Sequence, residues 1–265
     1  MQNQILSHLS PRYPWRENLT YFPEIDSTNN RLKLLAAQGA PQGTALVAGH
    51  QTGGRGRKGR SFFSPEGVGI YLSILLRPRC EAVQLMHLTC ATAVAMCDAL
   101  QGVTGLRPGI KWTNDIVFGS RKLSGILTEL GFTPQGELDY AVIGIGVNCC
   151  QQETDFPPEI RDMAGSLAMM TGKEIDRAQV AAAMLDSLFQ MNETLLTGKE
   201  AMFTRYRKDC ITLGHPVSLV RGEEVRHALA ETVDEAGALV VRYPDGHREV
   251  VNSGEVSVRG MYGYV

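Results

Sequence analysis

The sequence lacks several features that are typical of secreted or membrane-bound proteins. Its six cysteines include no CxxC pair, and the adjacent Cys149 and Cys150 are poorly placed for a disulfide. No apolar run approaches the roughly 18 residues that cross a bilayer. The N-terminus has no basic stretch followed by a long apolar run, so it does not resemble a secretory signal. We therefore predict a cytoplasmic protein that does not contact a membrane and keeps its thiols reduced.

The sequence also lacks an overall positive charge. Its formal net charge is −2 and its isoelectric point is near 6.3, whereas domains that bind nucleic acid broadly are usually basic. Apolar residues make up 43% and charged residues 20% of the 265 positions, as in an ordinary globular protein. This length suffices for one large domain and a small one. The single basic cluster, GGRGRKGR at 53–60, is therefore local, and we expect it to bind a small anion.

Local patterns predict an α+β fold for the larger part of the chain. Helices are predicted over 27–39, 81–102 and 176–209, and strands over 43–51, 69–78, 110–130 and 140–149. Ser27 suits a helix N-cap, and Gly39 and Gly102 suit helix ends. The dipeptide Gly119-Ser120 suits a tight turn that divides 110–130 into two hairpin strands. Helices and strands do not alternate strictly, which favours a sheet flanked by helices over a βαβ fold.

The last fifty residues have a different character. Five short β-prone runs follow Gly214 and are separated by the turn-forming stretches RGEE, DEAG and PDG. This spacing is typical of a small five-stranded β-barrel. We therefore predict two domains, residues 1–212 and residues 213–265.

The glycine-rich segment 53–60 has a composition that suits anion binding. Backbone N–H groups in such a turn can converge on an anion, and arginine offers two parallel donors to a phosphate or carboxylate. The GxxxxGK[ST] pattern of a P-loop is absent, and GIGVNC at 144–149 has Cys149 where a dinucleotide-binding turn needs its third glycine. Nonspecific RNA binding and an ordinary solvated turn are alternative interpretations.

Three other segments add polar side chains that could share one site with this loop. They contribute Ser27, Thr28 and Asn29 in DSTNN, Lys111, Asn114 and Asp115 in KWTND, and Lys122 in RKLSG. A helix start of this kind can bind a polar ligand group, although Ser27 is equally explained as an N-cap. A lysine in an apolar strand is most often a surface residue, so Lys122 alone indicates little.

Taken together, these segments resemble those of the biotin–protein ligases. EIDSTNN, GHQTGGRGRKGRSFFSPEG, GIYLSILLRP, KWTNDIV, RKLSGILTE and VIGIGVN follow one another in that family's order and at its spacings. The similarity covers residues 21–150 and resumes over the last fifty. It implies a class II synthetase-like catalytic domain, with a mixed or antiparallel sheet and flanking helices, and an SH3-like C-terminal barrel. It also implies an enzyme that converts biotin and ATP to biotinyl-5′-AMP and then biotinylates a carrier lysine.

The resemblance also implies roles for particular residues. The biotin-binding set is Ser27, Thr28, Asn29, Gln51, Gly54, Arg55, Gly56, Arg57 and Lys122. The ATP-binding set is Arg55, Arg57, Lys111, Asn114, Asp115, Asn148 and Arg259. Lys122 and Arg57 are the implied catalytic residues, because cations must offset the charge that develops when a carboxylate attacks a phosphate. Asp115 is the candidate Mg²⁺ ligand, and Trp112 and Phe62 are either pocket-wall residues or merely part of the core.

The implied partner is the biotin carboxyl carrier domain of a carboxylase. Only about twenty residues precede EIDSTNN, so we expect the form of the family that lacks an N-terminal DNA-binding domain and binds no DNA. The oligomeric state stays open between monomer and homodimer. Two rival functions also remain open, namely a related ligase for lipoate or octanoate and a non-enzymatic RNA-binding module.

Overall fold

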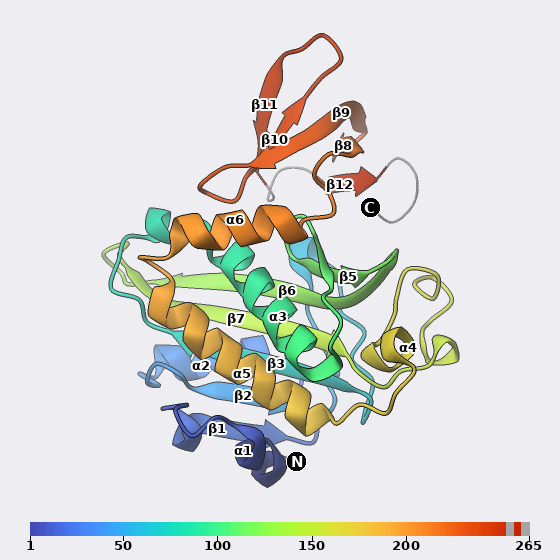
Figure 1. Ribbon diagram of the computed structural model, residues 1–265. Helices are drawn as coiled ribbons and strands as arrows, with labels where there is room; N and C mark the ends of the chain where they lie inside the picture. Colours follow the sequence, from blue (N-terminus) through green and yellow to red (C-terminus); the bar gives the residue numbers. More distant parts are fainter. Residues whose placement is uncertain (253–256, 261–265) are drawn as a thin grey trace.

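A seven-stranded sheet forms the centre of the larger part of the protein (Figure 1). The computed structural model describes residues 1–252 and 257–260. The strands run in the order β1-β2-β3-β7-β6-β5-β4, with only β1 and β2 parallel. Their bounds are β1 Leu19–Phe22, β2 Ala45–Ala48, β3 Gly69–Leu76, β4 Gly109–Lys111, β5 Asp115–Phe118, β6 Arg121–Phe132 and β7 Leu138–Asn148. The mixed sheet confirms the predicted α+β class.

Helices cover both faces of this sheet, as Figure 1 shows. They are α1 Gln2–His8, α2 Thr28–Ala37, α3 Leu88–Thr104, α4 Leu167–Thr171, α5 Arg177–Thr194 and α6 Lys199–Asp209. On one face Ile70, Leu72 and Ile74 of β3 pack into the main core with α3 and α5. On the other, Leu75 packs with Leu32 of α2 in a smaller cluster. Because β3 is covered on both sides, all its residues are buried, which explains its almost uninterrupted apolar run.

Three details of the predicted elements are wrong. Helix α3 passes through Gly102 and ends at Gly105, whose φ of 77° is a left-handed conformation that glycine adopts without strain. The segment 81–102 also begins with a separate 3₁₀ turn, Ala82–Leu85, before α3. The segment 110–130 forms three strands, because the chain leaves β4 after Lys111 and re-enters the sheet at Asp115. The tight turn at Gly119 is confirmed.

Helix α3 and the 3₁₀ turn before it contain the one stretch of the described residues that is long and apolar enough to cross a membrane. Within this stretch, Ala82–Thr104, 72% of an apolar 18-residue segment is buried inside the fold. Its buried apolar side chains contact α5 and the sheet and belong to the main core, whereas Val83 and Met86 are exposed.

The last part of the chain forms a five-stranded antiparallel sheet in the order β11-β10-β9-β8-β12. The strands are β8 Pro216–Arg221, β9 Glu224–Val233, β10 Leu239–Arg242, β11 Arg248–Val251 and β12 Ser257–Gly260. All five predicted β-prone runs are therefore strands, and the arrangement fits an SH3-like fold. In Figure 1 this sheet lies beyond α6, at one end of the larger sheet.

The turn between β9 and β10 attaches the small sheet to the large domain. Trp112 Nε1 donates a hydrogen bond to the carbonyl oxygen of Gly237 (2.9 Å). Arg207 of α6 donates two hydrogen bonds to the carbonyl oxygen of Val233 (2.8 and 3.1 Å). Trp112 is only 7% exposed, so this contact is buried. The KWTND segment is thus in direct contact with the C-terminal part of the chain.

A methyl group at position 237 should disturb this attachment. Gly237 has a φ of 86°, and a Cβ atom there would lie 2.9 Å from Cys90 Sγ. Gly246→Ala is the matched control, because Gly246 has a φ of 90° but nothing within 4 Å of the added Cβ. We expect the control to lose about 1 kcal/mol of stability from backbone strain. Gly237→Ala should lose about 1–2 kcal/mol more through the close contact with Cys90.

The measurement is the free energy of unfolding in urea for the wild type and both variants. Equal losses in the two variants would show that the turn does not pack tightly against Cys90.

Candidate functional site

Glycines of the central strands β6 and β7 form the floor of a pocket. A Cβ atom at Gly144 would lie 2.0 Å from Asn29 Oδ1, and one at Gly146 would lie 2.4 Å from the Phe62 ring. The start of α2 and the segment after the loop can therefore approach the sheet only because these positions carry no side chain. The pocket above them encloses about 490 Å³ and opens to solvent.

Segments that are far apart in the sequence line this pocket. The lining residues are Ser27, Thr28, Asn29, Gln51, Arg55, Gly56, Arg57, Phe62, Asn114, Lys122, Gly125, Ile126, Leu127, Gly144, Ile145 and Gly146. Nine of the residues with predicted roles are among them, together with the candidate wall residue Phe62. The floor residues of β6 and β7 were not predicted. The signal that could have revealed them is the pair of glycines in VIGIGVN together with Gly125 of RKLSGILTE, two segments that already carry the family resemblance.

One end of the pocket holds a connected set of uncharged hydrogen-bonding groups. The backbone N–H and the hydroxyl of Thr28 both donate to Gln51 Oε1 (2.9 and 3.0 Å). Ser73 Oγ, which is fully buried on β3, lies 2.7 Å from Thr28 Oγ1 and 2.5 Å from Asn29 Oδ1. Ser27 caps α2 by accepting from the Asn30 N–H, so it serves the helix as well as lining the pocket. These side chains are held in place before any ligand arrives.

The other end of the pocket is positively charged. Lys122 Nζ lies 2.6 Å from Asp115 Oδ1, and Arg57 donates to Asn114 Oδ1 (2.7 Å). Burial lowers the pKa of Arg57, and the nearby Asp115 carboxylate partly opposes this. Phe62 also lines the pocket, with its ring centroid 6.0 Å from Lys122 Nζ. The pocket thus combines a low-polarity floor with a lysine and an arginine at one end.

The glycine-rich loop folds into a narrow hairpin above the pocket. Phe62 N–H donates to the Gly54 carbonyl (3.0 Å), and Gly56 N–H donates to the Arg60 carbonyl (2.7 Å). A Cβ atom at position 54 would lie 2.5 Å from the Phe62 carbonyl oxygen, so this close pairing requires glycine. Of its cations, Arg57 is half-buried, whereas Lys58 and Arg60 are exposed.

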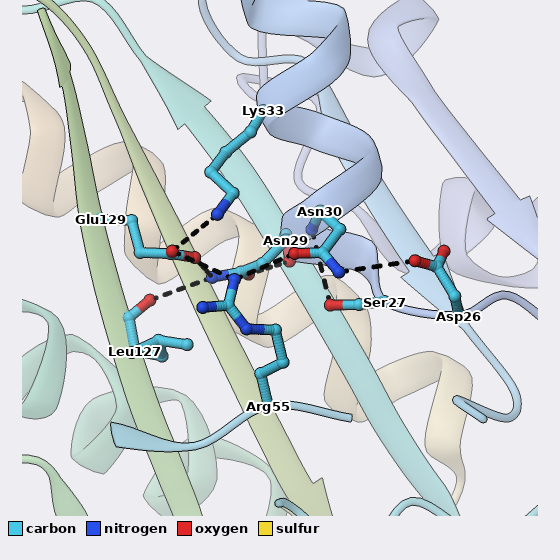
Figure 2. A network of polar contacts seen from close by, with 9 residues as sticks. Asp26, Ser27, Asn29, Asn30, Lys33, Arg55, Leu127 and Glu129 are labelled. Carbon is cyan, nitrogen blue, oxygen red and sulfur yellow. Dashed lines mark hydrogen bonds and ion pairs between the residues drawn. The ribbon is translucent and has the colours of Figure 1, made fainter. Parts of the chain in front are cut away.

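Glu129 of β6 is the centre of a charged network beside the pocket (Figure 2). Its Oε1 accepts from Lys33 Nζ (2.7 Å) and from Arg55 (3.2 Å), and its Oε2 accepts from Asn29 Nδ2 (2.9 Å). Arg55 also donates to Asn30 Oδ1 (2.9 Å). Burial by itself raises the pKa of Glu129, but the hydrogen bonds from Lys33 and Asn29 and the charges of Lys33 and Arg55 together hold it below its ordinary value. We did not predict Glu129 from the sequence.

Several residues with predicted roles lie outside the pocket lining. Gly54 belongs to the loop hairpin, and Asp115 contacts the site through Lys122. Lys111 is the last residue of β4. Asn148 uses its NH₂ group on the carbonyls of Gly165 (2.9 Å) and Lys122 (3.4 Å). The ligand roles of these residues stay predictions.

The remaining predicted residues are Arg259 and Trp112. Arg259 lies on β12, opposite Ser218 of β8, and its side chain is outside the described part of the structure. Trp112 is not among the pocket-lining residues but packs against the small sheet. Of its two predicted roles, that of a core residue is therefore the one confirmed, because the indole belongs to the main core and faces the β9–β10 turn.

A metal site does not stand out from the described side chains. Within residues 1–252 and 257–260, no three His, Cys, Asp or Glu side chains come together. Asp115 offers a single carboxylate, which is paired with Lys122. Mg²⁺ commonly takes one or two protein carboxylates and completes its shell with water and substrate phosphates. Asp115 therefore fits such a role only as a single ligand beside a phosphate substrate.

Comparison with known proteins agrees with this geometry. The model of the biotin/lipoate A/B protein ligase family matches residues 21–148, and that of the biotin protein ligase C-terminal domain matches residues 212–259. The biotin–[acetyl-CoA-carboxylase] ligase of Mycobacterium tuberculosis is 31% identical over 249 residues, which cover 91% of this chain and 89% of that protein. The chain belongs to the biotin protein ligase family.

Relatives of different lengths share this similarity. The bifunctional ligase/repressor BirA of Bacillus spizizenii is 41% identical over 169 residues, but the match spans about half of that protein's length (52%) and 64% of this chain. The structure of the Aquifex aeolicus biotin protein ligase in complex with biotin and ATP is 34% identical. It covers 92% of this chain and 99% of its own, with a TM-score of 0.76. The biotin protein ligase fold of both domains is thereby established.

The lowered pKa of Glu129 predicts a specific pH dependence. The pKa of Glu129 in the folded protein lies below its ordinary value of 4.5. Its ionised carboxylate therefore contributes its full stabilisation of the fold at pH values above 4.5. The contribution is lost as the pH falls below 4.5 and through the lowered folded pKa. We expect the stability gap between the wild type and Glu129→Gln to be constant near neutrality and to shrink in acid.

Urea unfolding measured from about pH 7 to about pH 3 tests this. Glu159→Gln, a change at an exposed position, is the control and should show no such gap. A gap for Glu129→Gln that stays constant into acid would mean that the network does not favour the ionised form.

Proposed function

We propose that the protein is a biotin–protein ligase that activates biotin with ATP and transfers it to a lysine of a biotin carboxyl carrier domain. The observation that carries the proposal is the polarity of the pocket. Uncharged donors and acceptors lie at one end beside the Arg55–Glu129 ion pair, an apolar floor lies in the middle, and Lys122 and Arg57 lie at the other end. Biotin has the same sequence of properties: a ureido group, an apolar ring and chain, and a carboxylate.

The uncharged end suits the ureido group. Thr28, Gln51 and Asn29 present amide and hydroxyl groups at fixed positions, and Ser73 supports two of them from below. The floor glycines leave room for a flat ring system against the sheet, and Phe62 can cover its apolar edge. A few fixed polar groups in an otherwise apolar pocket orient a ligand and give specificity.

The charged end suits the first chemical step. A carboxylate oxygen of biotin attacks the α-phosphorus of ATP, the bond to the β-phosphate oxygen breaks, and biotinyl-5′-AMP and pyrophosphate are formed. Because two anionic groups must approach each other, nearby cations lower the barrier. Lys122 and Arg57 both line the pocket at this end. Lys122 can keep its contact with Asp115 and still direct another N–H at the substrate carboxylate.

The second step transfers biotin to the carrier. The amine of the carrier lysine attacks the acyl carbon of the anhydride, and AMP leaves. The loop 53–60 covers the pocket between these steps and limits the access of water to the anhydride. Arg57 contributes to this cover because it joins the loop to Asn114, which also lines the pocket.

The nucleotide and metal roles complete the proposal. Lys111, Asn114, Asp115, Asn148 and Arg259 are the proposed ATP-side residues, with Arg55 and Arg57 from the loop. Mg²⁺ held in part by Asp115 would neutralise phosphate charge when bound. We further propose a catalytic domain of residues 1–212 and a small domain of residues 213–265. The small domain braces the KWTND segment through Trp112.

Pyrophosphate exchange tests the first step directly. Labelled pyrophosphate should enter ATP only when biotin is present, and Lys122→Ala should slow this exchange about a hundredfold, the order expected for one charged donor. Lys208→Ala, at an exposed position of α6, is the control and should keep the wild-type rate. Exchange that depends on lipoate or octanoate would assign the protein to the sister class. No exchange with any acid would overturn the proposal and lead to a test of salt-dependent RNA binding.

Release of the intermediate tests the role of the loop. Arg57→Gly should still form biotinyl-5′-AMP but release it, because the contact of the loop with Asn114 is lost. The readout is diffuse biotinylation of lysines on an added bystander protein. Arg60→Gly introduces a glycine into the same loop at an exposed position and should leave the bystander unlabelled. Labelling confined to the carrier in Arg57→Gly would contradict this role.

A further inference from the structure

Glu129 is a carboxylate in an otherwise apolar part of β6, and nothing in the proposed chemistry requires it there. Its side chain is 20% exposed, so it has lost most of its contact with water. A carboxylate in such a place is costly unless charged or hydrogen-bonded partners surround it. Its three partners, Asn29, Lys33 and Arg55, come from α2 and from the glycine-rich loop. Glu129 therefore joins the sheet, the helix and the loop at one point (Figure 2).

The contact with Asn29 determines which end of that amide faces the pocket network. An ionised carboxylate can only accept hydrogen bonds, so the NH₂ group of Asn29 must be the end that faces Glu129. The same NH₂ group also reaches the Leu127 carbonyl (3.4 Å). Asn29 Oδ1 is then directed to the Ser73 hydroxyl (2.5 Å). A neutral group at position 129 could donate as well as accept, and the amide of Asn29 could turn over.

The contact with Arg55 holds the beginning of the loop. Arg55 donates both to Glu129 and to Asn30 Oδ1, so its guanidinium spans the sheet and α2. Asn30 is in turn held by Asp26, just before the helix (3.4 Å). Arg55 is 42% exposed, so this pair alone contributes modestly to stability. Its effect falls on the loop, which is rich in glycine and loses much conformational freedom when it is ordered.

We propose that Glu129 is a positioning residue that fastens the glycine-rich loop to the sheet and sets the orientation of the Asn29 amide. Both effects prepare the uncharged end of the pocket before a ligand enters. The identity of that ligand as biotin rests on the proposed function, but the fastening of the loop does not.

Tryptic cleavage without any ligand tests the fastening. Trypsin cuts after Arg57, Lys58 and Arg60, which all lie in the loop. We expect Glu129→Gln to speed cleavage there about fivefold, the effect of losing one ion pair in a network. Asp139→Asn is the matched control, since it removes the ion pair of Asp139 with Arg77 (2.6 Å) elsewhere in the same sheet. Cleavage at sites outside the loop should be unchanged in both variants, which shows that each is folded.

A double-mutant cycle separates the ion pair from other consequences of the change. If Glu129 acts on the loop through Arg55, Glu129→Gln should add no further acceleration of loop cleavage in an Arg55→Ala background. Equal acceleration in both backgrounds would overturn this part of the proposal. Glu129→Asp retains the charge and should restore part of the protection.

Biotin affinity tests the effect on Asn29. Titration calorimetry should show that Glu129→Gln binds biotin about fivefold more weakly than the wild type. The double variant should bind biotin more weakly than Arg55→Ala alone. In exchange assays the biotin KM should rise while kcat at saturating biotin stays within about twofold, as expected when ground-state and transition-state binding fall together. A fall in kcat with unchanged KM would contradict a positioning role.

These measurements separate the two proposals. If the loop of Glu129→Gln is cleaved faster but the wild type does not bind biotin, the proposed ligand is refuted and the role of Glu129 in holding the loop stands. Normal biotin binding by the wild type, with no change in either readout for Glu129→Gln, would refute the role of Glu129 and keep the proposed function.

Discussion

The site depends on compensation of charge between the glycine-rich loop and the sheet below it. Four cations in eight residues repel one another, and glycine gives the loop little intrinsic order. The two arginines nearest the pocket are held by polar groups of the central sheet region, Arg55 by Glu129 and Arg57 by Asn114. The loop can therefore lie over the pocket as a defined hairpin, and its remaining cations point to solvent.

A second constraint is the close approach of loop and helix to the sheet. Gly144 and Gly146 leave the space into which Asn29 and Phe62 fit, and a methyl group at either position would overlap them. Because Gly144 and Gly146 have no side chains, they form an open floor and also allow Asn29 and Phe62 to pack close to it as walls of the pocket. The uncharged hydrogen-bonding groups at one end, and Lys122 and Arg57 at the other, then face a common pocket that opens to solvent.

The segment that links the two sheets of the protein, KWTND, also contacts the glycine-rich loop at the pocket. Trp112 binds the β9–β10 turn, and two residues later Asn114 binds Arg57 of the loop. A disturbance of the small domain can therefore reach the loop through one short segment of backbone. This gives the C-terminal domain a structural role in the site, whatever contacts it makes with ATP or the carrier.

The sequence by itself determined the kind of fold and most of the pocket residues. Burial on both faces of β3 produces an apolar run, and the start of α2 carries a capping residue, so both are visible as local sequence patterns. The glycine-rich loop and the KWTND motif are each contiguous in the sequence and can be recognised in the same way. Only the tertiary structure decided that Glu129 belongs to the site and that Trp112 faces the other domain. Both depend on groups that meet across roughly 75 to 125 residues of sequence, as the Arg55–Glu129 and Trp112–Gly237 contacts show. No local periodicity or propensity records such a meeting, because it is decided by how the sheet and helices pack.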